Sequence, residues 1–280
     1  MTLISKNDLL DAAARFTDAS GINRVAEDVA LRPDLAGFRM YEAPIIGIAD
    51  ASDPCFGSLQ APEVIGPHFI LPETWLPGAR SVISFFSPFT DGVVAANERD
   101  RAEVPAEWLH ARIEGQNYIN ALTVHLRELI EGEGYACLIP PMDKRFWGNG
   151  KPAGVREDGT AFPGYTSNWS ERHVAYVCGL GTFGLSRGLI TAKGMAGRFG
   201  SIVTTMPVDA DQRPYTRYDE YCTRCGICAS NCPADAITLK EGKNQDACSA
   251  FCDQVRAKNA PRYGCGKCSV AVPCTRAIPR

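Results

Sequence analysis

The sequence predicts an α+β fold in two parts, a large front domain of helices and strands followed by a small cysteine-rich domain. Two observations predict this. Apolar residues up to residue 205 alternate between the spacing of helices and that of strands, and all but three of the 12 cysteines come after residue 221. Residues 209–218, with Pro214 and several charges, form the expected linker. We therefore predict domains of residues 1–212 and 213–280.

The front domain begins with a helix predicted over residues 5–30. Ser5 suits the N-cap, Asp8 follows three residues later, and apolar residues then recur at helical spacing. Two apolar runs, residues 43–49 and 79–86, predict strands, the second of which is stopped by a proline.

The strongest helical pattern covers residues 115–132. Its apolar residues form one stripe, and Gly132 and Gly134 end it. A further helix is predicted over residues 168–178 and a further strand over residues 199–205. Strands and helices of this kind together indicate a mixed core.

Residues 143–168 mix glycine, proline and aromatic residues with little periodicity. Long irregular segments inside compact domains are often lids or pocket walls. A packed surface loop explains the same composition equally well. Both interpretations of this segment therefore stay open at the level of sequence.

A run of four cysteines that ends in Cys232-Pro233 is the most specific motif of the chain. Its spacing, C-x2-C-x2-C-x3-C-P, is that of bacterial ferredoxins, in which three thiolates bind one cubane and the fourth binds a second cluster. A disulfide framework would need secretion, and a zinc ribbon would need paired C-x2-C knuckles. The motif therefore predicts [4Fe–4S] clusters.

Cysteines downstream of this motif supply ligands for a second cluster. By the crossover logic, the first cluster takes Cys222, Cys225, Cys228 and Cys274. The second cluster takes Cys232, Cys248, Cys265 and Cys268. Cys252 lies four residues after Cys248, so the two share a face of a helix and either can be the ligand; we favour Cys248. The remaining thiols are expected not to bind metal: Cys55, Cys137 and Cys178.

Composition argues against several classes of protein. The formal charge of −3 and the pI of 5.9 give no general attraction to nucleic acid or to an anionic membrane. No apolar stretch is long enough to span a bilayer, and the N-terminus lacks the pattern of a secretory signal. A chain with 12 cysteines is typical of a reducing compartment. We therefore expect a cytoplasmic protein without a membrane partner.

A glycine-rich loop formed by Gly179, Gly181 and Gly184 matches the pattern G-x-G-x-x-G. A dinucleotide-binding loop needs a strand before it and a helix after it, whereas here a helix-like segment precedes and a strand follows. We therefore reject NAD binding by this loop. Its glycines either let a flat cofactor approach the backbone or form a purely structural tight turn.

Several segments together resemble a known family. They are residues 171–184, which begin with Glu-Arg-His-Val-Ala-Tyr-Val and end with the glycine-rich loop, residues 200–205, and the cysteine motif. These segments resemble epoxyqueuosine reductase and, more distantly, the reductive dehalogenases. The strand at 79–86, the helix from residue 115 and the knuckle ending at Cys268 fit in the same order. The resemblance covers most of the chain, from residue 40 to the end.

The resemblance implies a nitroreductase-like domain of the corrinoid-binding type, followed by a bacterial two-cluster ferredoxin-like domain. Electrons would pass from a low-potential donor, a ferredoxin or flavodoxin, through two [4Fe–4S] clusters to a cobalamin that reduces a small-molecule substrate. By motif position, the residues that would contact the cobalamin are Arg172, Gly179, Gly181, Phe183 and Gly184.

Three departures from the family pattern bear on these expectations. Leu185 replaces the basic residue that commonly follows the last glycine of the loop. The aspartate proton donor of the family has no counterpart; Tyr165 stands nearest its place, and a phenol can act as a general acid, so Tyr165 is the candidate catalytic residue. The chain ends soon after Cys274, without the helical repeats that bind tRNA in epoxyqueuosine reductase, so we do not expect a tRNA substrate.

Two other functions are compatible with the same residues. One is a ferredoxin-type electron-transfer protein whose front domain holds no corrinoid and docks a partner. The other is a reductase whose front domain binds a flavin, because nitroreductase-like scaffolds also hold flavins. No Asp-x-His-x-x-Gly run is present, so none of the four histidines is an obvious lower ligand for cobalt.

Overall fold

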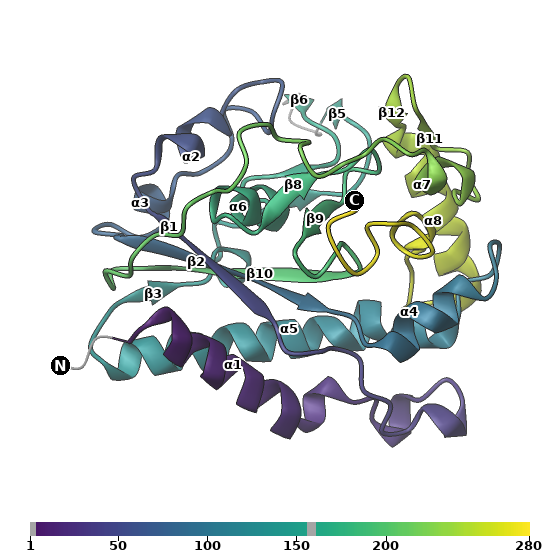
Figure 1. The fold of residues 1–280 in the computed structure, drawn as a ribbon, viewed down its shortest axis with the longest axis horizontal. Helices are drawn as coiled ribbons and strands as arrows, with labels where there is room; N and C mark the ends of the chain where they lie inside the picture. Colours follow the sequence, from purple (N-terminus) through teal and green to yellow (C-terminus); the bar gives the residue numbers. More distant parts are fainter. Residues whose placement is uncertain (1–3, 156–160) are drawn as a thin grey trace.

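A four-stranded antiparallel sheet forms the centre of the computed structural model, which describes residues 4–155 and 161–280. The strands lie in the order β1-β2-β10-β3 (Figure 1). Their bounds are β1 Ile45–Asp50, β2 Ser81–Pro88, β10 Gly197–Thr204 and β3 Cys137–Leu138. β2 and β10 pair along their whole length, from Ser81 opposite Thr204 to Pro88 opposite Gly197.

Helices cover both faces of this sheet (Figure 1). One core cluster joins Ile83 and Phe85 of β2 to the helices α1 (Lys6–Ala19), α4 (Asp91–Glu98) and α5 (Ala106–Gly132). A second cluster lies around Val82 and includes side chains of α2 (Pro54–Ser58), α3 (Pro72–Trp75) and α6 (Glu171–Val177). Because both faces are covered, every residue of β2 from 81 to 87 is buried.

The α+β prediction is confirmed. The strands predicted at 43–49, 79–86 and 199–205 correspond to β1, β2 and β10, and the helix predicted at 168–178 corresponds to α6. The helix predicted over residues 5–30 is shorter than expected, because α1 ends at Ala19.

The end of α1 has a local cause. Ser20 adopts an extended backbone with φ −74° and ψ 120°, and its hydroxyl accepts a hydrogen bond from the Ile22 amide at 3.3 Å. It thereby caps a 3₁₀ turn in place of another turn of α1. The predicted start of the helix is correct, since Ser5 and Asp8 form a reciprocal capping box.

Two helices of the front domain differ from the sequence prediction. α5 begins at Ala106 rather than at residue 115, because its first turns carry Trp108 and Ala111 into the core cluster together with polar residues that obscure the stripe. α4 was not predicted at all. It is short, and Thr90 caps it by accepting from the Val93 amide at 3.4 Å.

Short two-stranded ribbons and turns complete the front domain. The ribbons are β4 (Gly148–Asn149) with β7 (Thr166–Ser167), β5 (Gly154–Val155) with β6 (Ala161–Phe162), and β8 (Gly181–Phe183) with β9 (Leu189–Thr191). The 3₁₀ turns are η1 Gly21–Asn23, η2 Glu27–Val29, η3 Pro33–Leu35 and η4 Pro140–Met142.

The cysteine-rich segment lies against one end of the sheet and its helices (Figure 1). Its elements are α7 Ile227–Ser230, the ribbon β11 Ile237–Thr238 with β12 Gly242–Lys243, α8 Gln245–Asn259 and η5 Lys267–Ser269. Buried Lys267 donates through Nζ to the Asn97 carbonyl at 3.0 Å, and the Met195 amide donates to the Cys274 carbonyl at 3.0 Å. The segment is thus bonded closely to the front domain, and the boundary between residues 212 and 213 stays a prediction.

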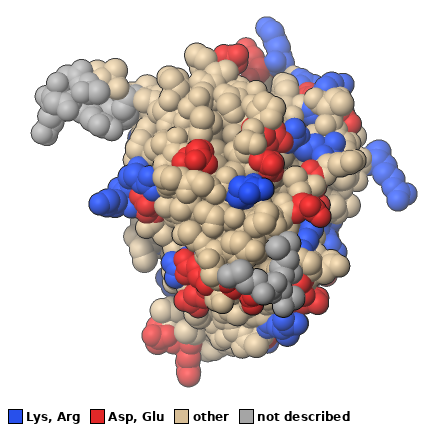
Figure 2. Space-filling model, turned by 90° about the vertical axis from the view of Figure 1, so that its left-hand side faces the viewer, with Lys and Arg blue, Asp and Glu red and all other residues tan. Residues whose placement is uncertain are grey.

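Charge on the outer surface is mixed. On the face drawn in Figure 2, acidic and basic side chains are interspersed and no single sign dominates. Of the described helices, none is long and apolar enough to cross a membrane.

Candidate functional site

The four cysteines predicted to hold the first cluster surround one hollow. Cys222, Cys225 and Cys228 line it together with Cys274, which comes from the far end of the chain. Burial raises the pKa of Cys274 to about 12, and the three other thiols add to the effect of burial by repelling its thiolate form. The Leu185 amide donates to Cys222 Sγ at 3.4 Å. The structure therefore brings these four residues together, and their role as ligands stays a prediction.

The second predicted set also lies in one neighbourhood. Burial raises the pKa of Cys268, and the nearby thiols of Cys248 and Cys232 act in the same direction. Burial likewise raises the pKa of Cys265 to about 12, with Cys268 and Cys248 adding to it. The Ala236 amide donates to Cys232 Sγ at 3.3 Å. Thiols gathered in this way resist the loss of their protons. Bound iron cations would offset this resistance by stabilising the thiolates.

The choice between Cys248 and Cys252 remains open. Both lie on one face of α8, as predicted, and the Cys252 thiol hydrogen-bonds to Cys248. That bond lowers the pKa of Cys248 and raises the pKa of Cys252. Cys252 is also close enough to Cys265 for the two thiols to interact. Either sulfur therefore faces the second set.

A left-handed glycine shapes each two-residue knuckle. Gly226, directly after Cys225, has a φ of 79°, and Gly266, directly after Cys265, has a φ of 71°. Glycine adopts this conformation without the steric cost that a side chain brings. A side chain at Gly266 would also overlap the ring of Trp108. These glycines let both cysteines of each knuckle turn toward the same point.

Among the described residues, no three Cys, His, Asp or Glu side chains converge closely enough to hold a single metal ion. Four thiols around a hollow are the arrangement that a cubane needs, because each of its irons takes one thiolate.

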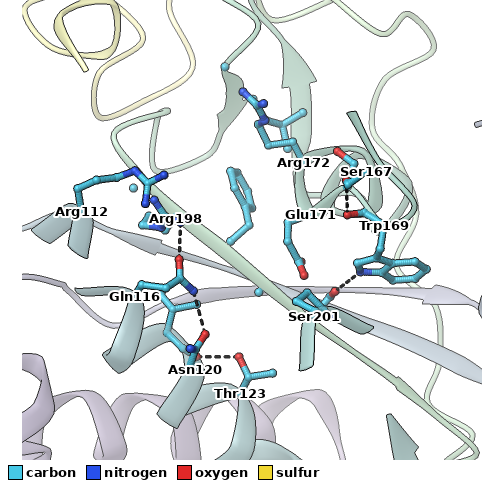
Figure 3. A pocket seen from close by; sticks show the side chains of 18 of the residues that line it. Arg112, Gln116, Asn120, Thr123, Ser167, Trp169, Glu171, Arg172, Arg198 and Ser201 are labelled. Carbon is cyan, nitrogen blue, oxygen red and sulfur yellow. Dashed lines mark hydrogen bonds between the residues drawn. The ribbon is translucent and has the colours of Figure 1, made fainter. Parts of the chain in front are cut away.

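A cavity of about 740 Å³ opens beside the second cysteine set (Figure 3). Its walls come from α5, the first half of β10, the start of α6, the turn between β8 and β9, and the cysteine-rich segment. Phe146 and Ser167 also line it, so part of the irregular segment 143–168 forms a pocket wall. Residues 156–160 of that segment lie outside the described residues. The contribution of the cysteine-rich segment consists of Lys243, Cys268 and Ser269.

Glu171, the first residue of α6, carries a buried carboxyl that faces this cavity (Figure 3). Its Oε2 has no hydrogen-bond partner within the described part of the chain. Burial raises the pKa of Glu171 to about 7, against the smaller opposing effects of the Ser201 hydroxyl and the Arg198 guanidinium. Ser201 Oγ itself accepts from Trp169 Nε1 at 2.9 Å. The site therefore contains a carboxyl whose burial favours its protonated form.

Three arginines line the same cavity: Arg112 of α5, Arg172 of α6 and Arg198 of β10. Burial, together with the smaller effect of the neighbouring Arg112 charge, lowers the pKa of Arg198 to about 10. Burial also lowers the pKa of Arg172, while the Cys268 thiolate opposes this shift. Arg172 therefore lies close to Cys268 of the second cysteine set.

Of the residues predicted to contact a cofactor, Arg172 alone lines the cavity. Gly181 lies in β8, where a side chain would overlap the Ile190 carbonyl oxygen of β9. Gly179 has a φ of 81° and packs near Gln212. The ring of Phe183 packs at a tilt against that of His173, with ring centroids 4.7 Å apart. These contacts give Gly179, Gly181 and Phe183 a structural role that needs no ligand.

Gly184 lies elsewhere, at the hollow of the first cysteine set. One end of the glycine-rich loop therefore reaches the first cysteine set, and contact of the loop with a cofactor stays a prediction. The rejection of a dinucleotide loop agrees with the structure, since α6 precedes the loop and the β8–β9 ribbon contains it.

Tyr165, predicted as the proton donor, is bonded to the cysteine-rich segment. Its hydroxyl donates to Asp246 Oδ1 of α8 at 2.7 Å, and it is not among the residues that line the cavity. Its catalytic role stays a prediction that gains no support from its position. Glu171 was missed as a functional residue, although it begins the Glu-Arg motif, because its burial depends on β10, which is distant in sequence.

The comparisons with known proteins agree with this geometry. Residues 215–238, which contain the four-cysteine motif, match the family model described as a 4Fe-4S binding domain. The segment is therefore a [4Fe–4S] binding domain. No curated protein sequence matches the chain.

Among solved structures, a selenomethionine-labelled epoxyqueuosine reductase is similar to this chain with a TM-score of 0.50 and 18% identity, over 82% of this chain and 61% of that one. Epoxyqueuosine reductase from Bacillus subtilis is similar with a TM-score of 0.47 and 18% identity, over 84% of this chain and 62% of that one. A catabolic reductive dehalogenase is similar with a TM-score of 0.49 and 15% identity, over 84% of this chain and 30% of that one. The chain thus spans about three fifths of the length of the reductases that it matches. At this identity the likeness to the first structure is one of fold, and it confirms the predicted fold class.

Proposed function

We propose that the protein is an iron–sulfur reductase in which two [4Fe–4S] clusters deliver electrons to a group bound in the 740 Å³ cavity. One observation carries this proposal. Cys268 belongs to the second predicted ligand set and is also part of the cavity wall. A cluster held there would lie directly beside whatever occupies the cavity. Electron transfer into the cavity would then need no further carrier.

The first cluster is suited to receive the electrons. Cys225, one of its predicted ligands, is exposed, so a protein donor can approach this cluster from solvent. Cys228 of the first set and Cys268 of the second are near enough for their thiolates to interact, which places the two sets side by side. We propose a low-potential ferredoxin or flavodoxin as donor and a small molecule as substrate.

Cobalamin is the cofactor that the resemblance implies, and the cavity lining fits the character of such a molecule. Apolar side chains, among them Leu189, Met195 and Phe199, can pack on a flat ring, and a second group of polar side chains can pair with its peripheral amides. None of the four histidines lines the cavity, so the protein offers no imidazole ligand there. When bound, cobalamin would supply a strongly reducing cobalt centre.

In this proposal Glu171 holds the proton that the reduction consumes. Its unpartnered Oε2 is buried, and a carboxyl with a pKa near 7 has a proton to give at neutral pH. The enclosing walls from α5 and β10 would exclude water from the reacting group. Arg172 would add positive charge between the second cluster and the cavity.

Retention of cobalamin by the anaerobically purified protein tests the proposal. We expect corrin absorption to elute with the protein through gel filtration. Asn120→Trp places an indole into the cavity and should abolish the retention, whereas Glu128→Trp on the exposed side of the same helix should leave it unchanged. Loss of all corrin from the unmodified protein under reducing conditions would remove cobalamin from the proposal. Retention of a flavin instead would favour the flavin-binding alternative.

A further inference from the structure

The cavity contains more positive charge than its own walls compensate. Among its described lining residues, three arginines and Lys243 face a single acidic residue, Glu171. Burial raises the pKa of that carboxyl, so it offers little negative charge to balance them. Like charges gathered around one cavity repel one another, and a bound anion would relieve this repulsion.

The bonds of the three arginines confirm that they lack carboxylate partners in the described chain. Arg112 Nη2 donates to the Tyr263 hydroxyl at 2.9 Å, and Arg172 Nη1 donates to the Arg187 carbonyl at 2.8 Å. Arg198 donates to the side-chain oxygen of Gln116. All of these acceptors are neutral. None of these three guanidinium groups therefore has a carboxylate partner within the described ranges, and each has further N–H groups to donate.

Elsewhere in the molecule, enclosed arginines do have carboxylate partners. Arg213 pairs with Asp53 at 2.6 Å, and Arg262 pairs with Glu114. The difference marks the cavity arginines as available for a ligand.

The clusters account for only part of the excess charge. Arg172 lies near Cys268, so a cluster held by that thiolate would balance it. The neighbouring ionisable groups that shift the pKa of Arg198 are Arg112, Arg172 and two tyrosines, and no cysteine is among them. Arg198 therefore lies beyond the balance that the clusters provide, and Gln116 links it to the face of α5 that carries Arg112. Figure 3 shows the two arginine side chains near each other, with Arg172 and Glu171 placed across the cavity.

The scaffold holds the two arginines as a pair. Arg112 and Gln116 stand one turn apart on α5, so they share a face of the helix. Gln116 accepts from Arg198 of β10 and thereby fixes the second guanidinium beside the first. Two forked donors side by side are suited to a carboxylate or a phosphate, which accept such hydrogen bonds in pairs.

We propose that Arg112 and Arg198 bind the acid group, a carboxylate or a phosphate, of an anionic ligand in the cavity, with the rest of that ligand directed toward Glu171. The proposal deepens the proposed function, because it names the chemical class of the ligand. An acid group in this position lies on the far side of the cavity from the proton-bearing carboxyl. The acid group can belong to the substrate or to the phosphodiester of a cofactor, and the chemistry is the same for both.

Calorimetric titration of the anaerobically purified holoprotein with inorganic phosphate tests the site. We expect saturable binding that weakens at least about 10-fold in Arg198→Gln and in Arg112→Gln, because each removes charge-assisted hydrogen bonds. Arg15→Gln removes the same charge from the exposed side of α1 and should bind phosphate as the unmodified protein does. Circular dichroism identifies a variant that fails to fold, in which case the other variant decides. Absence of saturable binding, or equal binding by all variants, would overturn the proposal.

A second titration separates the two sources of the acid group. Phosphate binding that persists after the protein has been loaded with cobalamin assigns the site to the substrate, and binding that disappears assigns it to the cofactor. Iron is measured in the same samples. Protein that binds phosphate but holds no iron would refute the reductase and leave the anion site intact, whereas iron-loaded protein without phosphate binding would refute the anion site alone.

Discussion

Replacement of Glu171 by glutamine probes the most unusual ionisable group of the cavity. The amide keeps the size of the carboxyl and removes its charge, so the change isolates ionisation from packing. In the folded protein the pKa of Glu171 is about 7, compared with 4.5 for the ordinary group. The principal cause of this raised pKa is burial, and Oε2 has no hydrogen-bond partner among the described residues.

The free energy at stake follows from this difference. A raise from 4.5 to about 7 corresponds to about 3 kcal/mol against the charged form. Both states are protonated below pH 4.5, so the carboxyl costs no stability there. Above that pH the unfolded chain ionises first, and stability is lost as pH rises through the folded pKa. Glu171→Gln should therefore gain stability relative to the unmodified protein as pH rises from 5 to 8, by up to about 3 kcal/mol.

Infrared difference spectroscopy measures the same property directly and needs no substrate. The C=O band of a protonated carboxyl should be present in the unmodified protein and absent from Glu171→Gln. We expect this band to disappear with a midpoint near pH 7. A midpoint at or below pH 5 would show that Glu171 is solvated and would refute its role as the proton-bearing group.

Three further predictions concern the clusters and the glycine-rich loop. Cys225→Ser should lose about half of the bound iron, because it removes one ligand of the first cluster, and elemental analysis checks this. Of Cys248→Ser and Cys252→Ser, the former should lose iron and the latter should keep it; the opposite result would reverse the ligand assignment. Gly181→Ala should destabilise the protein by several kcal/mol in thermal unfolding, because the methyl group overlaps the backbone of β9. Gly132→Ala, at the open end of α5, should be neutral or stabilising by about 0.5–1 kcal/mol, and equal effects of both changes would contradict this account.

The local sequence predicted those parts of the site whose chemistry is contained in short motifs. Cysteine spacing identified the [4Fe–4S] binding domain, because the loop geometry that a cubane needs is built from adjacent residues. The crossover rule also paired Cys274 with the first three cysteines, and these four residues line one hollow in the structure. The capping box of Ser5 and Asp8 was equally local.

The cavity was less accessible to sequence because separate elements assemble it. Arg112 and Arg198 come from a helix and a strand that are distant in the chain, and neither stands in a motif. The glycine-rich loop shows the opposite problem. Gly181 suggested contact with a cofactor, whereas its close approach is to the backbone of β9. A glycine pattern indicates that something lies close to the backbone, and only the fold shows what it is.

The central claim is that two cubanes stand beside a cavity to which they supply electrons. Analysis of iron and acid-labile sulfide in the anaerobically isolated protein tests it most directly. We predict about eight irons and eight sulfides per chain. A colourless protein, stoichiometric zinc, or only about four irons would contradict it.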